Sequence, residues 1–111
     1  MTDAARDVVK GTLDMLILKA LELGPMHGWG VGDRIETLSR GVFSLQTGTL
    51  YPALHRLLRR GWVAAEWRTT SNARRARYYR LTPAGRMRLE AERDSWLRAS
   101  TAVKRILDAV S

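Results

Sequence analysis

Apolar residues recur at helical spacing in the first part of the chain. They predict a helix over residues 8–23, whose stripe at i, i+3 and i+4 spacing comprises Val9, Leu13, Leu16, Ile17, Ala20 and Leu21. Met15, Leu18 and Leu23 widen this stripe, so we expect the helix to be the central, buried one. Gly24 and Pro25 end it.

A second helix is predicted over residues 27–39, with Trp29, Ile35 and Leu38 facing the core. Gly28, Gly30 and Gly32 each lower helix propensity by roughly 1 kcal/mol. We expect glycines at such positions where another helix backbone packs closely. His27 is predicted to be a structural residue of the turn into this helix. In the turn that follows it, Phe43 and Leu45 are expected to point inward.

A third helix is predicted over about residues 47–60, and its two faces differ sharply. Leu50, Leu54, Leu57 and Leu58 form the apolar face, and the opposite face carries Thr47, Thr49, Tyr51, His55, Arg56 and Arg59. The sequence leaves two positions open for the start of this helix. Pro52 in the first turn makes Thr49 the N-cap, whereas a start near Thr47 puts Pro52 deeper, with Gly48 leaving room for its ring. Gly61 is suited to follow the last turn.

A hairpin is predicted next, with strands over residues 62–67 and 77–81 and a polar loop over 68–76. Trp62 and Trp67 are expected to pack in the core or on a sheet face. Tyr79 is expected inward and Tyr78 toward the outer surface. Three helices followed by a hairpin is the order of a winged helix-turn-helix. The sequence thus predicts a mainly α (α+β) fold, with this domain over residues 1–81 and the wing over about 62–81.

The last helix begins at Thr82-Pro83, an N-cap followed by proline at the first position, and we expect it to reach about residue 109. Leu89, Trp96, Val103 and Val110 recur every seven residues and form a heptad seam, to which Ile106 and Leu107 add aliphatic surface. A helix of this length cannot bury its whole stripe on so small a domain. We therefore interpret residues 82–111 as a dimerisation helix; the alternative is that it packs back on its own domain.

Charge is concentrated in one stretch. Of the net charge of +8, seven units lie between residues 56 and 80, which contain eight arginines and one acid, Glu66. Such a field suits a polyanion. The chain has no cysteine, its two histidines are isolated, and no catalytic set of acids or nucleophiles is visible, so we expect neither an enzyme nor a cofactor or metal. The longest apolar run, residues 15–18, is too short for a membrane span, and we expect a cytoplasmic protein.

Five stretches together resemble the PadR family of bacterial transcriptional regulators, in particular its short members with a single C-terminal helix. They are KGTLDMLIL (10–18), LGPMHGWG (23–30), GTLYPALHRL (48–57), RGW (60–62) and RYYRLTPAG (77–85). The resemblance implies a dimer of winged helix-turn-helix domains, joined by the last helix, that binds an inverted-repeat operator and usually represses. The chain departs from the family at Trp29, where tyrosine is frequent, and at Gln46, which replaces a better cap.

The predicted DNA contacts are Thr47, Thr49, Tyr51 and His55 near the start of the third helix, and Arg56, Arg74, Arg75, Arg77 and Tyr78. The first group should reach base edges or nearby phosphates, and the arginines mostly phosphates, with entry of a wing arginine into the minor groove as the alternative. The alternatives are a solvated helix histidine at 55 and a merely solvated charge cluster on the wing.

A ligand site is predicted around Trp96. In a two-fold helix pair Trp96 lies near its symmetry mate, and Ala99 and Ser100 are too small to fill the space one turn on. Such a slot suits a planar aromatic or phenolic effector, and it is similar to the tryptophan-lined drug site of multidrug-sensing family members. The alternative is that the two rings stack and fill the interface.

Three functions remain after these observations. The first is a ligand-responsive DNA-binding repressor. The second is a winged-helix protein-interaction module, which would not need the positive charge near the third helix and wing. The third is an effector-independent DNA-binding protein, which the small residues beside Trp96 disfavour.

Overall fold

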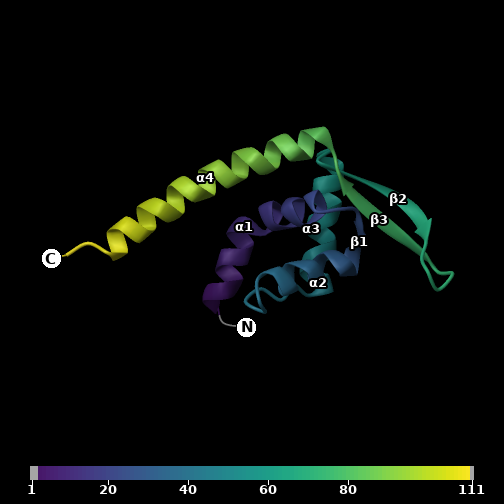
Figure 1. The fold of residues 1–111 in the computed structure, drawn as a ribbon, viewed down its shortest axis with the longest axis horizontal. Helices are drawn as coiled ribbons and strands as arrows, with labels where there is room; N and C mark the ends of the chain where they lie inside the picture. The colour runs from purple at the N-terminus through teal and green to yellow at the C-terminus, as the bar shows by residue number, and fades with distance from the viewer. Residues whose placement is uncertain (1–2, 111) are drawn as a thin grey trace.

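The computed structural model describes residues 3–110, with side chains from Thr12 onward. This part of the chain forms, in order, α1 (Asp3–Glu22), β1 (Met26–His27), α2 (Gly28–Leu38), α3 (Thr47–Arg59), β2 (Val63–Thr69), β3 (Arg75–Leu81) and α4 (Pro83–Leu107). Helices α1 to α3 and the sheet form one body, from which α4 runs outward, so that the C-terminus lies far from the hairpin (Figure 1). The extents are 62 × 30 × 20 Å. The predicted mainly α (α+β) winged helix-turn-helix architecture is confirmed.

Helix α1 supplies the centre of the core, as predicted. Ile17 and Leu18 are fully buried, and they belong to the same buried cluster as Leu54 of α3 and Val63 of β2. The helix begins earlier than residue 8 and ends at Glu22, so Leu23 is exposed instead of widening the apolar stripe. The predicted core position Val9 lies outside the residues whose side chains are described.

Helix α2 is rotated relative to the prediction. Its buried residues are Gly28, Gly30, Val31, Gly32 and Ile35. Trp29 and Leu38 were expected in the core and are instead 59% and 60% exposed. The glycines explain the difference, because a Cβ at Gly28 would lie 2.5 Å from Cε1 of Tyr51. Gly30 faces the side chains of β1, and Gly32 faces Leu50 of α3. Side chains therefore approach these glycines, where the sequence had indicated a helix backbone.

Helix α3 begins at Thr47, which decides between the two starts left open by the sequence. Gln46 is the N-cap, with an extended backbone at φ −81° and ψ 155°, and Pro52 lies inside the helix. Thr49 is thus a helical residue and not the cap. Among the described residues, a Cβ built at Gly48 would meet no atom within 4 Å apart from its chain neighbours and the nearby backbone of its own helix, so the helix around it is not crowded. Gly61, at φ 75°, follows the helix end as expected.

The sheet has the antiparallel order β1-β3-β2, and its hairpin is longer than predicted. Both strands extend into the predicted loop, residues 68–76, so that only a turn over residues 70–74 separates them. Strand β1 was not predicted, because two residues are too few to show an alternating pattern. Tyr79 is buried and Trp62 half-buried, in agreement with the sequence, whereas Trp67 is 60% exposed.

The first turns of α4 are built into the body. The Thr82 hydroxyl accepts a hydrogen bond from the Gly85 amide at 3.0 Å and donates one to the Gly61 carbonyl at 2.7 Å. A Cβ at Gly85 would collide with the Trp62 carbonyl, so α4 starts in close contact with the hairpin. Leu89 is only 1% exposed and belongs to the core of its own chain. Its assignment to a dimer seam was therefore wrong.

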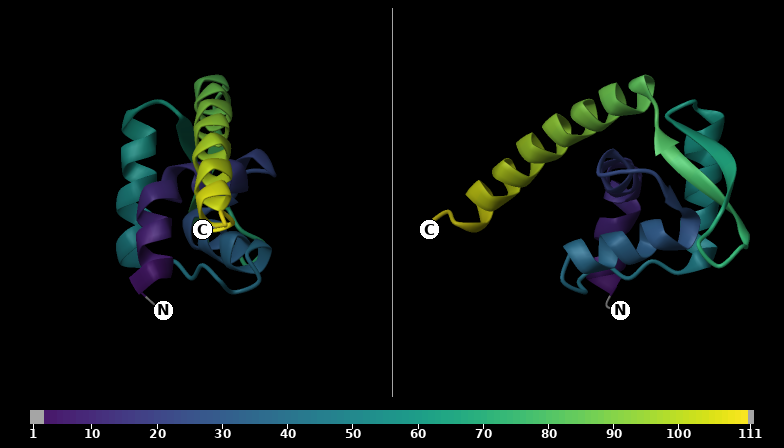
Figure 2. Two further views of the ribbon diagram at one scale, coloured as in Figure 1. Left: turned by 90° about the vertical axis from the view of Figure 1, so that its left-hand side faces the viewer. Right: turned by 45° about the vertical axis from the view of Figure 1, so that its right-hand side comes forward.

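The distal half of α4 runs away from the body (Figure 2). Val103, Ile106 and Leu107, which we call the aliphatic row, are between 54% and 77% exposed. Val110 lies beyond the last helical residue, Leu107, and is almost fully exposed. None of the helices between residues 3 and 110 is long and apolar enough to cross a membrane.

Candidate nucleic-acid interface

Positive charge gathers on α3 and the hairpin, which lie side by side. Strand β2 packs against α3, and the hairpin runs alongside that helix in the right-hand view of Figure 2. The exposed arginines of this region, which we call the basic surface, are Arg59, Arg60, Arg68, Arg74, Arg75 and Arg80. Arg59 belongs to α3, Arg68 to β2, and Arg75 and Arg80 to β3, and the other two follow α3 and precede β3. The fold thus gathers a charge-rich stretch of sequence on α3 and the hairpin.

The start of α3 exposes the small polar groups predicted to contact DNA. Thr47 and Thr49 are exposed in its first turn, and His55 is exposed farther along. The leucines of the opposite face hold the helix on the core, with Leu50, Leu54 and Leu57 buried. Amides at a helix N-terminus and hydroxyls of this kind donate hydrogen bonds to phosphates or base edges.

Tyr51 and Arg56 are less available than the sequence indicated. Tyr51 is half-buried with its ring against Gly28, so only part of it faces outward. Arg56 donates a hydrogen bond to the Asp14 carboxylate of α1 and forms an ion pair with it. Arg56 is thus not the free cation that the helical pattern implied. Sequence reasoning missed Asp14, because it lies 42 residues away on another helix.

The wing tip is a tight turn closed by its own backbone and side chains. The Thr70 amide donates to the Arg74 carbonyl at 2.6 Å, and the Thr70 hydroxyl accepts from the Arg74 amide at 3.3 Å. Ala73 has φ 61°. The turn holds Arg74 at the tip, and Arg75 and Arg77 follow on β3. Arg77 is half-buried, and its guanidinium lies 5.9 Å from the centre of the Tyr79 ring.

Tyr78 belongs to an aromatic cluster on the outer sheet face. Its ring meets His27 edge-on at 5.3 Å, and the Arg68 guanidinium lies 5.2 Å from its centre. His27 in turn stacks on Trp29 at 3.8 Å and accepts a hydrogen bond from the Gly30 amide at 3.1 Å. The predicted structural role of His27 is confirmed, and Tyr78 is half-buried by these neighbours.

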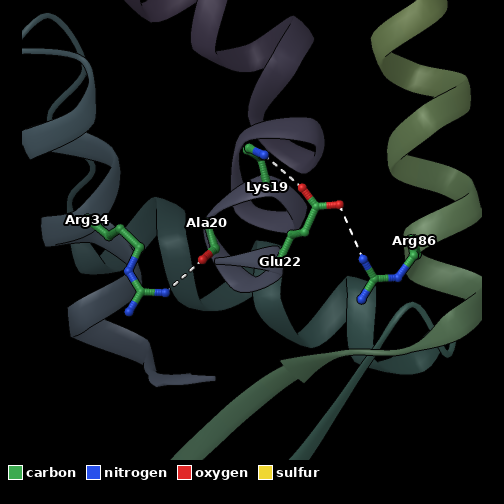
Figure 3. A network of polar contacts seen from close by, with 5 residues as sticks. All are labelled: Lys19, Ala20, Glu22, Arg34 and Arg86. Carbon is green, nitrogen blue, oxygen red and sulfur yellow. Dashed lines mark hydrogen bonds and ion pairs between the residues drawn. The ribbon is translucent and has the colours of Figure 1, made fainter. Parts of the chain in front are cut away.

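The junction of α1 and α4 is tied by polar contacts (Figure 3). Glu22 accepts from Lys19 at 2.7 Å and from Arg86 of α4 at 3.4 Å. The hydrogen bond from Lys19 lowers the pKa of Glu22, and the positive charges of Lys19, Arg86 and Arg93 add to this effect. Together they outweigh partial burial, which raises the pKa. Arg34 of α2 donates to the carbonyls of Ala20 and Gly24, at the end of α1. The contact between Glu22 and Arg86 joins α4 to the end of α1, and the Arg34 contacts hold α2 against the same end.

A small cavity of about 210 Å³ lies between α1 and α4. It is lined by Thr12, Met15, Glu92, Ser95, Trp96 and Ala99. Trp96 remains 44% exposed. Ala99 lines this cavity as its predicted neighbour, whereas the Ser100 hydroxyl donates to the Leu97 carbonyl of its own helix at 3.2 Å.

Comparisons with known proteins agree with this geometry. The solved structure of a PadR family regulator from Eggerthella lenta is 28% identical, covers 94% of this chain and 88% of that chain, and has a TM-score of 0.79. A PadR-like regulator from Bacillus cereus shares the fold, with a TM-score of 0.82 at 24% identity over 94% of this chain and 99% of that one. A transcriptional regulator of Mycobacterium tuberculosis is 45% identical over 58 residues, about half of each chain.

The family model for PadR-like transcriptional regulators matches residues 17–91, which run from the buried centre of α1 into α4. Proteins of this family bind DNA and regulate transcription, and they are not enzymes. The chain therefore belongs to the PadR-like family of transcriptional regulators.

Proposed function

We propose that the protein acts as a homodimeric, ligand-responsive repressor that binds an inverted-repeat operator. The observation that carries the proposal is the aliphatic row, which α4 holds away from the body with more than half of each side chain exposed. Exposed aliphatic positions at i, i+3 and i+4 on a helix are typical of a helix–helix interface. In this division of labour residues 1–81 bind DNA and residues 82–111 join two copies.

The DNA contacts that we propose follow from the basic surface. Thr47, Thr49 and His55 face outward on α3 and would enter the major groove, with the exposed part of Tyr51 beside them. Arg74, Arg75 and Arg77 would meet phosphates beside that groove. Tyr78 would contact DNA through the wing surface that it shares with Arg68. Arg56 would contact DNA only after its ion pair with Asp14 is broken.

The effector site that we propose lies around Trp96 and Ala99, with Ser100 nearby. The cavity of about 210 Å³ beside Trp96 is smaller than the ~300–1,000 Å³ usual for ligand pockets. A second copy that brings its own Trp96 to the same place would enlarge the cavity and give it two aromatic walls. A planar aromatic or phenolic molecule clamped there would release DNA only if it bound two arrangements of the dimer with different affinity.

The dimer is tested by sedimentation at micromolar concentration. The wild-type chain should sediment as a dimer, and Val103→Glu should dissociate it because a carboxylate would be desolvated in the interface. Met87→Glu is the matched control, since Met87 is an exposed residue of α4 outside the aliphatic row. A monomeric wild type, or equal dissociation by both variants, would refute the interface.

The effector site is tested by fluorescence titration with planar aromatic compounds. Quenching should be seen with the wild-type dimer and weaken in Trp96→Ala. Unchanged affinity in the variant would exclude this site, and an absence of quenching with every compound would favour two rings that simply fill the interface. Release of a bound duplex on addition of the same compound distinguishes a ligand-responsive regulator from an effector-independent DNA-binding protein.

A further inference from the structure

Trp67 is an exposed indole on the part of the hairpin that extends past the core. Alternation along β2 puts Val63, Ala65 and Trp67 on one sheet face, and the register pairs them with Leu81, Tyr79 and Arg77 of β3. Val63 and Tyr79 are buried, so this is the face that covers the core. Two residues farther out, the same face carries Trp67 with 60% of its surface exposed.

One arginine lies over this ring, and two others occupy neighbouring positions of the hairpin. The Arg75 guanidinium lies 5.3 Å from the centre of the Trp67 ring, within reach of a cation–π contact. Arg77 is the cross-strand partner of Trp67, and Arg74 occupies the turn beyond it. A lone exposed apolar side chain needs no explanation, but this one lies within the basic surface and on the strand that packs against α3.

A ring beside a guanidinium matches the chemistry of the DNA minor groove. The walls of that groove are deoxyribose edges, which are largely apolar, and they are flanked by phosphates. Proteins that bind the minor groove combine arginine with apolar side chains placed against the sugars or between base steps. Arginine is drawn further to the narrow groove of A·T-rich DNA by its negative potential. Trp67 supplies the apolar partner, and Arg75 supplies the charge.

We propose that Trp67 and Arg75 make a joint contact with the minor groove beside the major-groove site of α3. The indole packs on the deoxyribose wall, and the guanidinium pairs with a phosphate or enters the groove. This inference rests on the proposed function, because it needs the wing to lie beside the duplex. It adds a non-ionic contact, from a residue that the sequence had indicated as packing in the core or on a sheet face.

The two residues should be separable by salt dependence. The probe is a fluorescein-labelled duplex that the wild-type protein selects from a random-sequence pool, and binding of the full chain is followed by anisotropy. Trp67→Ala should weaken binding roughly tenfold, or about 1.4 kcal/mol, while the log–log salt slope stays unchanged because no counterion is released by an indole. Arg75→Ala should make the slope shallower by about 0.9 for each phosphate that is no longer neutralised.

Two variants control the experiment. Trp67→Phe keeps an aromatic ring and should recover most of the affinity that Trp67→Ala removes. Met87→Ala removes an exposed apolar side chain of α4, outside the basic surface, and should bind as the wild type does. Far-ultraviolet circular dichroism confirms that each variant is folded before it is titrated.

The outcomes distinguish this inference from the broader proposal. If Trp67→Ala binds as tightly as the wild type, the contact does not exist, although DNA binding stands. If it flattens the salt slope as Arg75→Ala does, Trp67 only positions the arginine and the inference is overturned. If the wild-type chain selects no duplex, the proposed operator binding fails first.

The groove is assigned by base substitution in the flank of the site. Inosine·cytosine pairs present the minor groove of A·T without the guanine amino group, while keeping a major groove like that of G·C. The wild type should tolerate inosine·cytosine in place of A·T and bind less tightly to G·C, and Trp67→Ala should reduce this difference. Equal weakening with both replacements would place the contact in the major groove and refute the assignment.

Discussion

Asp14 sets how much positive charge α3 presents to a partner. Its carboxylate pairs with Arg56, and both side chains are partly shielded from solvent, at 27% and 43% exposure. A paired arginine has to exchange one anion for another before it can neutralise a phosphate. A residue on α1 thereby reduces the effective charge of a residue on α3, the helix that we propose to bind DNA.

Asp14→Asn should release Arg56 and steepen the salt dependence of DNA binding. One additional phosphate contact per protomer would increase the log–log slope by about 0.9 per protomer, as measured by anisotropy over a range of salt concentrations. Asp108→Asn is the matched control, because it removes the same charge from a Lys104 pair on the distal end of α4. A slope that is unchanged, or changed equally by both variants, would mean that Arg56 does not reach the backbone.

Gly28→Ala should destabilise the protein by about 1–3 kcal/mol, the usual range for overpacking a filled site. The added Cβ would lie 2.5 Å from the Tyr51 ring, which cannot move without disturbing the packing between α2 and α3. Urea unfolding measures the change in stability. Gly48→Ala provides the contrast, because beyond the local helix backbone its Cβ would meet no described atom within 4 Å. It should stabilise α3 by about 0.5–1 kcal/mol. Equal stabilities would show that Tyr51 has free space.

At the scale of elements, the sequence predicts best where its signal is local. The leucines of α3 and the Thr82-Pro83 start of α4 carry their own spacing or capping chemistry, and both elements lie where they were predicted. The rotation of α2 was missed because three glycines define its buried side, and a hydrophobic pattern cannot register side chains that are absent. Strand β1 was missed because it exists only through its pairing with β3.

For the candidate site too, the sequence predicts the features that have a local signal and misses those that depend on distant contacts. The exposed positions of α3 and the concentration of arginine are visible in the sequence. The Asp14–Arg56 pair and the burial of Leu89 depend on contacts between distant segments, which no local pattern reveals. The outward position of Trp67 depends on where the core ends beneath the hairpin.

Gln46→Ser should stabilise α3 by about 0.5–1 kcal/mol, since serine is a preferred N-cap. The backbone of Gln46 already has the extended conformation of a cap, but its side chain makes no capping hydrogen bond to the described helix. Thermal and urea unfolding test the change. Thr82→Ala should shift stability in the opposite direction, because it removes a cap that is formed in α4. Failure of Gln46→Ser to stabilise the chain would indicate that the start of α3 is held by packing alone.

At the scale of the whole molecule, the ion pair between Glu22 and Arg86 couples the body to α4. The pKa of Glu22 is lowered from its ordinary value of 4.5, so the folded state holds the ionised form more strongly than the unfolded chain does. The resulting stability is fully present above the unfolded pKa and is lost as the pH falls through the folded one. Because the pairs are partly exposed, their contribution is below about 1 kcal/mol.

Glu22→Gln should therefore lower the free energy of unfolding at about pH 7 and lower it by less at about pH 3.5, which lies below the unfolded pKa of 4.5. Urea unfolding at the two pH values measures the difference. Glu90→Gln, at an exposed position of α4, should show no such pH dependence. A constant difference between wild type and Glu22→Gln would mean that the side chain matters for packing and not for charge.

The anchoring of α4 by its first turns makes the rest of the helix a lever arm. From Leu89, which is fixed in the core, to Leu107 the helix extends about 27 Å at ~1.5 Å per residue. A tilt of about 10° at the anchor would displace its end by roughly 5 Å, more than the ~3.4 Å that separate adjacent base pairs. In the proposed dimer, small adjustments at Thr82, Gly85 and Glu22 would thus be magnified into the distance between the two DNA-binding helices. The tolerance of the regulator for operators of different spacing would then be set by the mechanical stiffness of that short joint.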